Sequence, residues 1–322
     1  MRIQYRIQNN EIEIVRCFGN DPKIVLPGCI EGKHVHSVAA YAFSDRKGKE
    51  ETDVLEFETA DHFLVKGEER LLAGAGPEEL VLPDTVWKIG NYAFYGCKNL
   101  ERFSFSGSLT QLGSGAFTGC GKLRRLDVYM DQGGKSCVKE ILGELWQRID
   151  VTFLYETGAR AQFVFPEHYE EAVENTPARI LFTQHHGTGN HYRQCFYNKE
   201  LDCRKYDELF PLAVAQDGVE LLSDLAFCRL ESGYELTVRN REMYEAYVRE
   251  NLSQIVRYLL EHEKIAWVEL LSKRKLWSRT ALDEAVEQAA ALGKAEVVAY
   301  LMNERYKWSP EKTQKKRKRF EL

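Results

Sequence analysis

The residue types that could bind a metal gather in one segment of the sequence. His185, His186 and His191 are followed by Cys195 and Cys203. Histidine and cysteine are the ligands that zinc prefers, and a zinc site needs three or four of them in tetrahedral geometry. The segment has neither a CxxC nor an HxxxH pair to anchor such a site. We therefore expect a polar loop here, and a metal-dependent or enzymatic module around His185–Cys203 is the alternative hypothesis.

Other catalytic patterns are equally incomplete. Gly187-Thr188-Gly189 lacks both the Lys-Ser/Thr pair of a phosphate-binding loop and the third glycine of a dinucleotide fingerprint. A cysteine nucleophile needs a base that is oriented toward it, and nothing in the spacing supplies one. The sequence contains no GxSxG or HExxH motif. We therefore expect no enzyme, no catalytic residue, no metal and no cofactor.

The clearest pattern is an internal repeat, which must provide the scaffold for any site. The stretch from Ile89 to Phe105 is repeated 23 positions later as Leu112 to Val128. When the two copies are aligned, each apolar residue of the first matches an apolar residue of the second. Positions 103 and 105 alternate as in a half-buried strand, and Ala-Phe-x-Gly-Cys is long enough for a single turn only. A repeat of this length predicts a solenoid, in which stacked neighbours bury the apolar side of each unit.

These residues resemble the BspA-like subfamily of bacterial leucine-rich repeats, with its pattern I-G-x-x-A-F-x-x-C-x-x-L-x-x-L. The likeness extends upstream through Val38–Phe43 and Ile24–Pro27, so that it covers about residues 3–128. Phe63–Gly67 looks like the degenerate hairpin repeat of that family. The resemblance implies a solenoid of about five short units that binds proteins or other macromolecules and does not catalyse a reaction.

In such a solenoid the strand residues that alternate away from the core form one continuous exposed face. Mixed charges with a few apolar groups suit a protein partner better than a phosphate backbone. A merely solvated sheet face is the alternative. The residues predicted to form the protein-binding face are Lys23, Val25, Val54, Glu56, Glu79, Val81, Arg102, Ser104, Arg125 and Asp127.

Both ends of the solenoid need a cover. Residues 3–16 alternate around Asn9-Asn10 and predict a capping hairpin. A second cover is predicted after the last repeat, as an amphipathic helix over residues 136–148 with Ser136 as its N-cap. Strands over 151–155 and 160–165 follow. The apolar face of the predicted capping helix consists of Val138, Ile141, Leu142, Leu145 and Trp146.

Helix-forming residues dominate from Pro166 onward. Tyr169, Ala172 and Val173 suggest a short helix that ends near Pro177, and longer helical patterns run from about residue 206 to 306. Thr280–Ala285 and Gly293–Leu301 resemble an ankyrin repeat without its proline and histidine, and an ordinary antiparallel helix bundle is the alternative. The domains expected are 1–165 (repeats with capping hairpin and helix), 166–310 (helical, ankyrin-like) and 311–322 (a disordered basic tail).

Composition and charge narrow the class of partner and the compartment. The net charge of −5 argues against nucleic-acid binding by the whole chain, although the basic tail leaves a nucleic-acid-linked sensor as an alternative. No apolar run is long enough to span a membrane, and the first ten residues lack the core of a secretion signal. The eight cysteines include no CxxC pair and predict free thiols rather than a disulfide framework.

We therefore expect a cytoplasmic, non-catalytic bacterial scaffold that binds an unidentified protein. A cell-surface adhesin is the alternative if a signal peptide has been trimmed from the start. The sequence assigns no oligomeric state.

Overall fold

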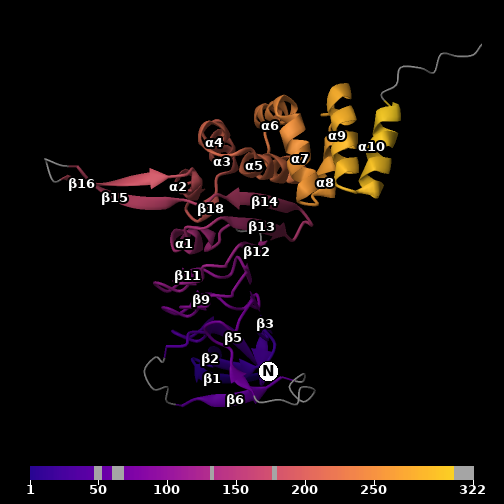
Figure 1. Ribbon diagram of the computed structural model, residues 1–322. Helices are drawn as coiled ribbons and strands as arrows, with labels where there is room; N and C mark the ends of the chain where they lie inside the picture. The colour runs from indigo at the N-terminus through magenta and orange to yellow at the C-terminus, as the bar shows by residue number, and fades with distance from the viewer. Residues whose placement is uncertain (47–52, 60–68, 131–133, 176–179, 308–322) are drawn as a thin grey trace, which may run out of the picture. The chain divides into compact units, whose positions relative to one another are not determined.

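The described part of the chain forms two compact units, residues 1–237 and residues 238–307, apart from the gaps given below. The degenerate hairpin repeat predicted at Phe63–Gly67 and the basic tail 311–322 lie outside the described residues. The computed structural model describes residues 1–46, 53–59, 69–130, 134–175 and 180–307 (Figure 1).

The main element of the first unit is a six-stranded sheet in the order β14-β13-β12-β10-β8-β3. Its first five strands in the chain are parallel, and only β14 runs antiparallel to its neighbour. Each parallel strand comes from one turn of the chain, so the sheet is the wall of a solenoid (Figure 1). The strands are β3 (Lys23–Val25), β8 (Glu79–Val81), β10 (Arg102–Ser106), β12 (Arg125–Met130), β13 (Ile149–Tyr155) and β14 (Arg160–Phe165).

The strand register confirms the repeat of 23 residues. Arg102 lies opposite Arg125, and Glu79 lies opposite Arg102. Between strands, the turn at Ala93-Phe94 inserts Phe94 into the core, where its ring packs between those of Phe43 and Phe117 at centroid distances of 5.3 and 5.0 Å. Residues one repeat apart therefore stack in columns.

The glycine of the I-G pair is required for close approach between turns. A Cβ atom at Gly90 would lie 2.4 Å from the backbone nitrogen of Ala40, and one at Gly113 would lie 2.3 Å from that of Asn91. Gly90 N–H donates to the Val38 carbonyl and Gly113 N–H to the Ile89 carbonyl, both at 2.8 Å. These bonds tie successive turns together at a distance that no larger residue permits.

A second, mixed sheet lies across the core, in the order β11-β9-β5-β2-β1-β6. Its β1–β2 hairpin turns at Asn9-Asn10, both with positive φ, as the sequence predicts for the capping hairpin. Two further short strands extend this sheet, because β4 pairs with β5 and β7 pairs with β2. The strands are β1 (Arg2–Gln8), β2 (Glu11–Gly19), β4 (Cys29–Ile30), β5 (Lys33–Val38), β6 (Leu55–Glu58), β7 (Arg70–Leu71), β9 (Lys88–Ile89) and β11 (Gln111–Leu112).

The other end of the solenoid is covered by helices. The capping helix α1 is shorter than predicted, with Cys137 rather than Ser136 as its N-cap, and it buries Val138, Ile141 and Leu142. Trp146 lies beyond its end and is exposed, so its predicted place in the core is wrong. The helices that follow in this unit are α1 (Val138–Gly143), α2 (Gly189–Arg193), α3 (Cys203–Glu208), α4 (Phe210–Gln216) and α5 (Val219–Ser232).

Tyr206 of α3 completes the edge strand β14. Its hydroxyl accepts a hydrogen bond from Val164 N–H (3.0 Å) and donates one to the Val164 carbonyl (2.6 Å). The side chain is fully buried. One phenol therefore satisfies two polar backbone groups that would otherwise be buried without partners.

Replacing Tyr206 with phenylalanine is expected to destabilise the first unit by about 1–3 kcal/mol, because it removes both hydrogen bonds and keeps the ring. Urea unfolding of the two proteins measures the difference. Tyr197→Phe, at a tyrosine that is 82% exposed, is the matched control and should change stability by less than about 0.5 kcal/mol. Equal stabilities of Tyr206→Phe and the wild type would contradict this role.

The helix predicted around Tyr169–Val173 is wrong. The chain forms an antiparallel hairpin of β15 (Tyr169–Asn175) and β16 (Ile180–His186) instead. The segment has no regular apolar alternation, and its pairing with β16 selects the strand. A second small hairpin joins β17 (Phe196–Tyr197) and β18 (Glu200–Leu201).

The described residues of the second unit are helical, as predicted. The helical pattern predicted over about residues 206–306 divides into separate helices, and α6 and α7 meet at Asn251. The last two helices form a hairpin around Gly293, and their likeness to an ankyrin repeat stays a prediction. No helix among the described residues is long and apolar enough to cross a membrane. The helices are α6 (Val238–Glu250), α7 (Leu252–Glu261), α8 (Ile265–Lys273), α9 (Arg279–Ala291) and α10 (Ala295–Lys307).

Candidate functional site

Eight of the ten residues predicted to bind a protein lie together on the outward side of the six-stranded sheet. They form two columns in register, one starting each strand and the other two positions later. Val54 and Glu56 do not join them, because β6 pairs with β1 in the other sheet. The strand face is the set Lys23, Val25, Glu79, Val81, Arg102, Ser104, Arg125 and Asp127, together with Tyr129 at the next outward position of β12.

Charge pairs occupy much of the strand face. Arg102 Nε lies 2.5 Å from Asp127 Oδ2, and this hydrogen bond raises the pKa of Arg102. Ser104 Oγ lies 3.5 Å from the same Asp127 oxygen, and Ser104 and Asp127 are buried rather than exposed as predicted. Lys23 is 3.3 Å from Glu79. These residues are already engaged with each other.

Arg125 differs from its neighbours in this face. Its side chain is exposed, and it makes no hydrogen bond or ion pair within the described part of the chain. Tyr129, on the same side of β12, is 50% exposed. The sequence predicts Arg125 as a binding residue but misses Tyr129. Continuing the strand alternation past Val128 by one residue would have found it.

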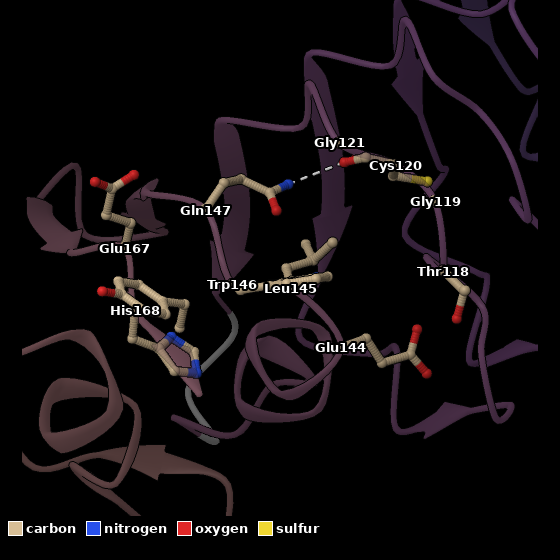
Figure 2. Close-up of a pocket in the computed structure, with 11 residues that line it drawn as sticks. Thr118, Gly119, Cys120, Gly121, Glu144, Leu145, Trp146, Gln147, Glu167 and His168 are labelled. Carbon is tan, nitrogen blue, oxygen red and sulfur yellow. Dashed lines mark hydrogen bonds between the residues drawn. The ribbon is translucent and has the colours of Figure 1, made fainter. Parts of the chain in front are cut away.

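A pocket lies between the last repeat and the start of β15, and we call it the aromatic pocket. Its volume is about 520 Å³. Two large aromatic side chains line it while remaining open to solvent, Trp146 at 65% and Tyr169 at 54% exposure. In Figure 2 the two glutamates of the pocket lie on opposite sides of Trp146. The lining consists of Thr118, Gly119, Cys120, Gly121, Glu144, Leu145, Trp146, Gln147, Glu167, His168 and Tyr169.

Side-chain hydrogen bonds connect one wall of the pocket to the last repeat. Gln147 Nε2 donates to the carbonyls of Cys120 (2.9 Å, Figure 2) and Leu123 (3.1 Å). Glu144 Oε2 accepts from Phe117 N–H at 2.7 Å. The segment that follows α1 is therefore bound to the repeat at both of its ends.

Arg193 of α2 joins this wall to the opposite one. Its guanidinium donates to the carbonyls of Leu142 (3.2 Å), Leu145 (3.3 Å) and Gln147 (2.9 Å), and also to that of Pro166. Burial lowers the pKa of Arg193 to about 10. His168 N–H adds a bond to the Trp146 carbonyl at 2.9 Å. No pattern in the sequence points to Arg193, because its partners are main-chain oxygens distant in the chain.

The histidines and cysteines of the alternative metal module are dispersed. His186 stacks on Tyr169 at a centroid distance of 4.3 Å, and His191 is exposed. Cys195 and Cys203 are buried, and burial raises the pKa of each thiol to about 12. The side chain of His185 lies outside what the structure describes. Within the described residues, no group of three or more histidine, cysteine or acidic side chains could hold a metal ion.

A parallel sheet built from one strand per turn, with a repeated Phe in the core, defines a leucine-rich repeat solenoid. Its repeats are of the BspA type, because residues 72–140 match the BspA type leucine rich repeat region in six copies. Leucine-rich repeats of this type indicate a protein-interaction or adhesin-like role.

Two solved structures show similarity to part of the chain. A leucine rich cell surface protein from Faecalibacterium prausnitzii is 19% identical over 41% of this chain and 36% of its own, with a TM-score of 0.28. The leucine-rich repeat protein of T. pallidum is 19% identical over 39% of this chain and 68% of its own, with a TM-score of 0.23. The chain thus spans about a third of the first of these proteins. No curated protein matches it.

Proposed function

We propose that the protein is a non-catalytic scaffold that binds a partner protein through the strand face. Arg125 carries this proposal, because it is an exposed guanidinium with no partner among the described residues. Arginine and tyrosine are enriched among the residues that dominate binding energy, and Tyr129 lies on the same side of β12. Residues 1–165 contain the binding surface in this proposal, and the helices from α6 (Val238–Glu250) onward belong to a separate compact unit.

The composition of the strand face supports a protein partner over a nucleic acid. Lys23, Arg102 and Arg125 are interspersed with Glu79 and Asp127, and two of the three cations are already paired. A phosphate backbone would require a continuous positive surface. The exposed Val25 at one end adds an apolar contact that suits a protein.

We also propose a cytoplasmic location. All eight cysteines are free thiols. Cysteines that stay unpaired are typical of a reducing compartment.

Arg125→Glu is expected to weaken binding of the partner about 30-fold, because a central arginine contributes about 2 kcal/mol or more to a protein interface. The measurement is quantitative mass spectrometry of the proteins that the full chain retains from the native cell, followed by the Kd of the main one. The thermal melt should change little, since the exposed Arg125 side chain makes no hydrogen bond or ion pair with the described residues.

Lys139→Glu is the matched control for this experiment. Lys139 is an exposed residue of α1, and the substitution changes the net charge by the same amount as Arg125→Glu. The proposal expects Lys139→Glu to retain the partner. If both variants retain it, or both lose it, the strand face is not the binding surface.

A further inference from the structure

We propose that the aromatic pocket is a second, independent binding site that takes a positively charged side chain, lysine or arginine, of a partner protein. The strand face has no part in this site. The proposal rests on the exposed aromatic surface, the charge of the lining and the fixed geometry of the walls.

The aromatic side chains supply an open π-surface. Trp146 is 65% exposed although it follows directly after Leu145, which is buried. An exposed indole does not contribute the hydrophobic stabilisation that a buried one would. Indole gives the strongest cation–π attraction of the three aromatic side chains. Tyr169 has one face covered by His186 and leaves its remaining surface to the pocket.

The charged groups of the lining have one sign. Glu144 and Glu167 both contribute to the pocket, and none of its lining residues is a lysine or arginine. Lys122, next to the lining residue Gly121, directs its ammonium group to the side-chain oxygen of Asn99 at 2.9 Å. A cation that enters the pocket would therefore find two carboxylates and no competing positive group in the lining.

Glu144 is positioned as well as charged. Its Oε2 accepts the Phe117 N–H at 2.7 Å, so the carboxylate is held beside the turn of the last repeat. Glu167 follows directly after Pro166, whose carbonyl accepts a hydrogen bond from Arg193. The Glu144 carboxylate is thus held by the repeat, whereas α2 holds the backbone that precedes Glu167; the two glutamates lie on opposite sides of Trp146 in Figure 2.

The pocket is formed before a ligand arrives. Gln147 and Arg193 fix the backbone on both walls, so binding does not have to order a loop. Preorganisation of this kind increases affinity by lowering the entropic cost of association. Its volume of about 520 Å³ lies in the usual range of ligand sites and exceeds what one extended basic side chain fills.

The test uses the full chain labelled with 5-fluorotryptophan and three capped tripeptides. These are acetyl-Gly-Arg-Gly-amide, acetyl-Gly-Lys-Gly-amide and acetyl-Gly-citrulline-Gly-amide, of which the last has nearly the shape of arginine without its charge. Fluorine NMR reports each of the five tryptophans, and Trp146→Phe assigns the resonance of position 146. We expect the Trp146 signal to shift with the arginine and lysine peptides, with a Kd on the order of 1 mM.

Substitutions separate the contribution of the indole ring from that of the two carboxylates. Trp146→Leu, which keeps an apolar side chain, should weaken the arginine peptide about tenfold in ligand-observed NMR. Glu144→Gln combined with Glu167→Gln should weaken it about fivefold, and the glutamine at 144 can still accept the Phe117 N–H. Glu220→Gln, at an exposed glutamate of α5, is the control and should change nothing. The double glutamine variant should also lose most of the salt dependence of binding.

Three results would overturn the proposal. One is an unchanged Trp146 signal at about 20 mM peptide, well above the expected Kd. Another is an equal shift with the citrulline peptide, which would make the charge irrelevant. The third is a shift with a neutral saccharide such as chitobiose and none with the basic peptides, which would assign the pocket to sugars.

Discussion

Asp207→Ala is expected to lower the free energy of unfolding of the first unit by about 3–5 kcal/mol. Asp207 and Arg229 form a two-pronged ion pair, with distances of 2.7 Å (Nε–Oδ1) and 3.0 Å (Nη2–Oδ2), and both side chains are fully buried. Removing the carboxylate takes both hydrogen bonds of this ion pair from a guanidinium that stays in the core. Such a group retains the full cost of desolvation and loses the attraction that offsets it.

Urea unfolding, followed by circular dichroism, measures this effect. The double variant Asp207→Leu/Arg229→Met should be more stable than Asp207→Ala, because it removes both charges. Lys23→Ala breaks an exposed ion pair with Glu79 and should cost at most about 1 kcal/mol. A loss below about 1 kcal/mol for Asp207→Ala would show that the buried pair does not support the cap of the solenoid.

Phe94→Ala is also expected to lower the free energy of unfolding of the first unit by about 3–5 kcal/mol. Phe94 is fully buried, and its ring contacts those of Phe43 and Phe117 from neighbouring turns and that of Phe103 from its own repeat. Each turn of a solenoid is stabilised mainly by its neighbours, so a cavity at this position weakens the contacts on both sides. We therefore expect faster hydrogen exchange in β9 and β11 together with the loss of stability.

Two substitutions control for this result. Phe94→Leu keeps most of the buried volume and should cost clearly less than Phe94→Ala. Tyr129→Ala removes an aromatic side chain that is half exposed and should stay within about 1 kcal/mol of the wild type. If Phe94→Ala and Tyr129→Ala were equally stable, the phenylalanine column would not be the core of the repeats.

The repeats are the part of the fold that the sequence predicts best. Equal spacing of Phe94 and Phe117, and of Phe103 and Leu126, reflects a contact that recurs in each turn. A contact that recurs in each turn requires a similar residue at the same position of each repeat. The register of β10 and β12 therefore follows directly from the 23-residue offset between the repeats. The columns of the strand face follow from that register.

Segments outside the repeats leave no such trace. Leu55–Glu58 has the alternation of a repeat strand, but it pairs with β1, and only a contact between distant segments decides this. Trp146 fits the helical spacing of the apolar residues in the sequence, but the helix α1 ends at Gly143, before it reaches Trp146. Tyr169–Asn175 becomes a strand through its pairing with β16. In each case the local pattern does not decide between the possible structures, and tertiary pairing selects one.

The candidate sites likewise include residues that the sequence predicts and residues that only the structure identifies. Arg125 and Arg102 are predicted together, but the structure distinguishes an engaged arginine from an available one. The aromatic pocket could not be predicted, since Glu144 and Trp146 come from one segment and Glu167 from another, and Arg193 of α2 holds the two together.

Site-specific photo-crosslinking in the native cell tests the central claim most directly. The photoreactive residue benzoylphenylalanine replaces Tyr129 in one protein and Tyr197, a tyrosine that is 82% exposed, in another. The account predicts one dominant crosslinked protein from position 129, absent when Arg125→Glu is combined with it, and no such product from position 197. Crosslinking from position 197 alone, or the same products from both positions, would contradict a binding role for the strand face.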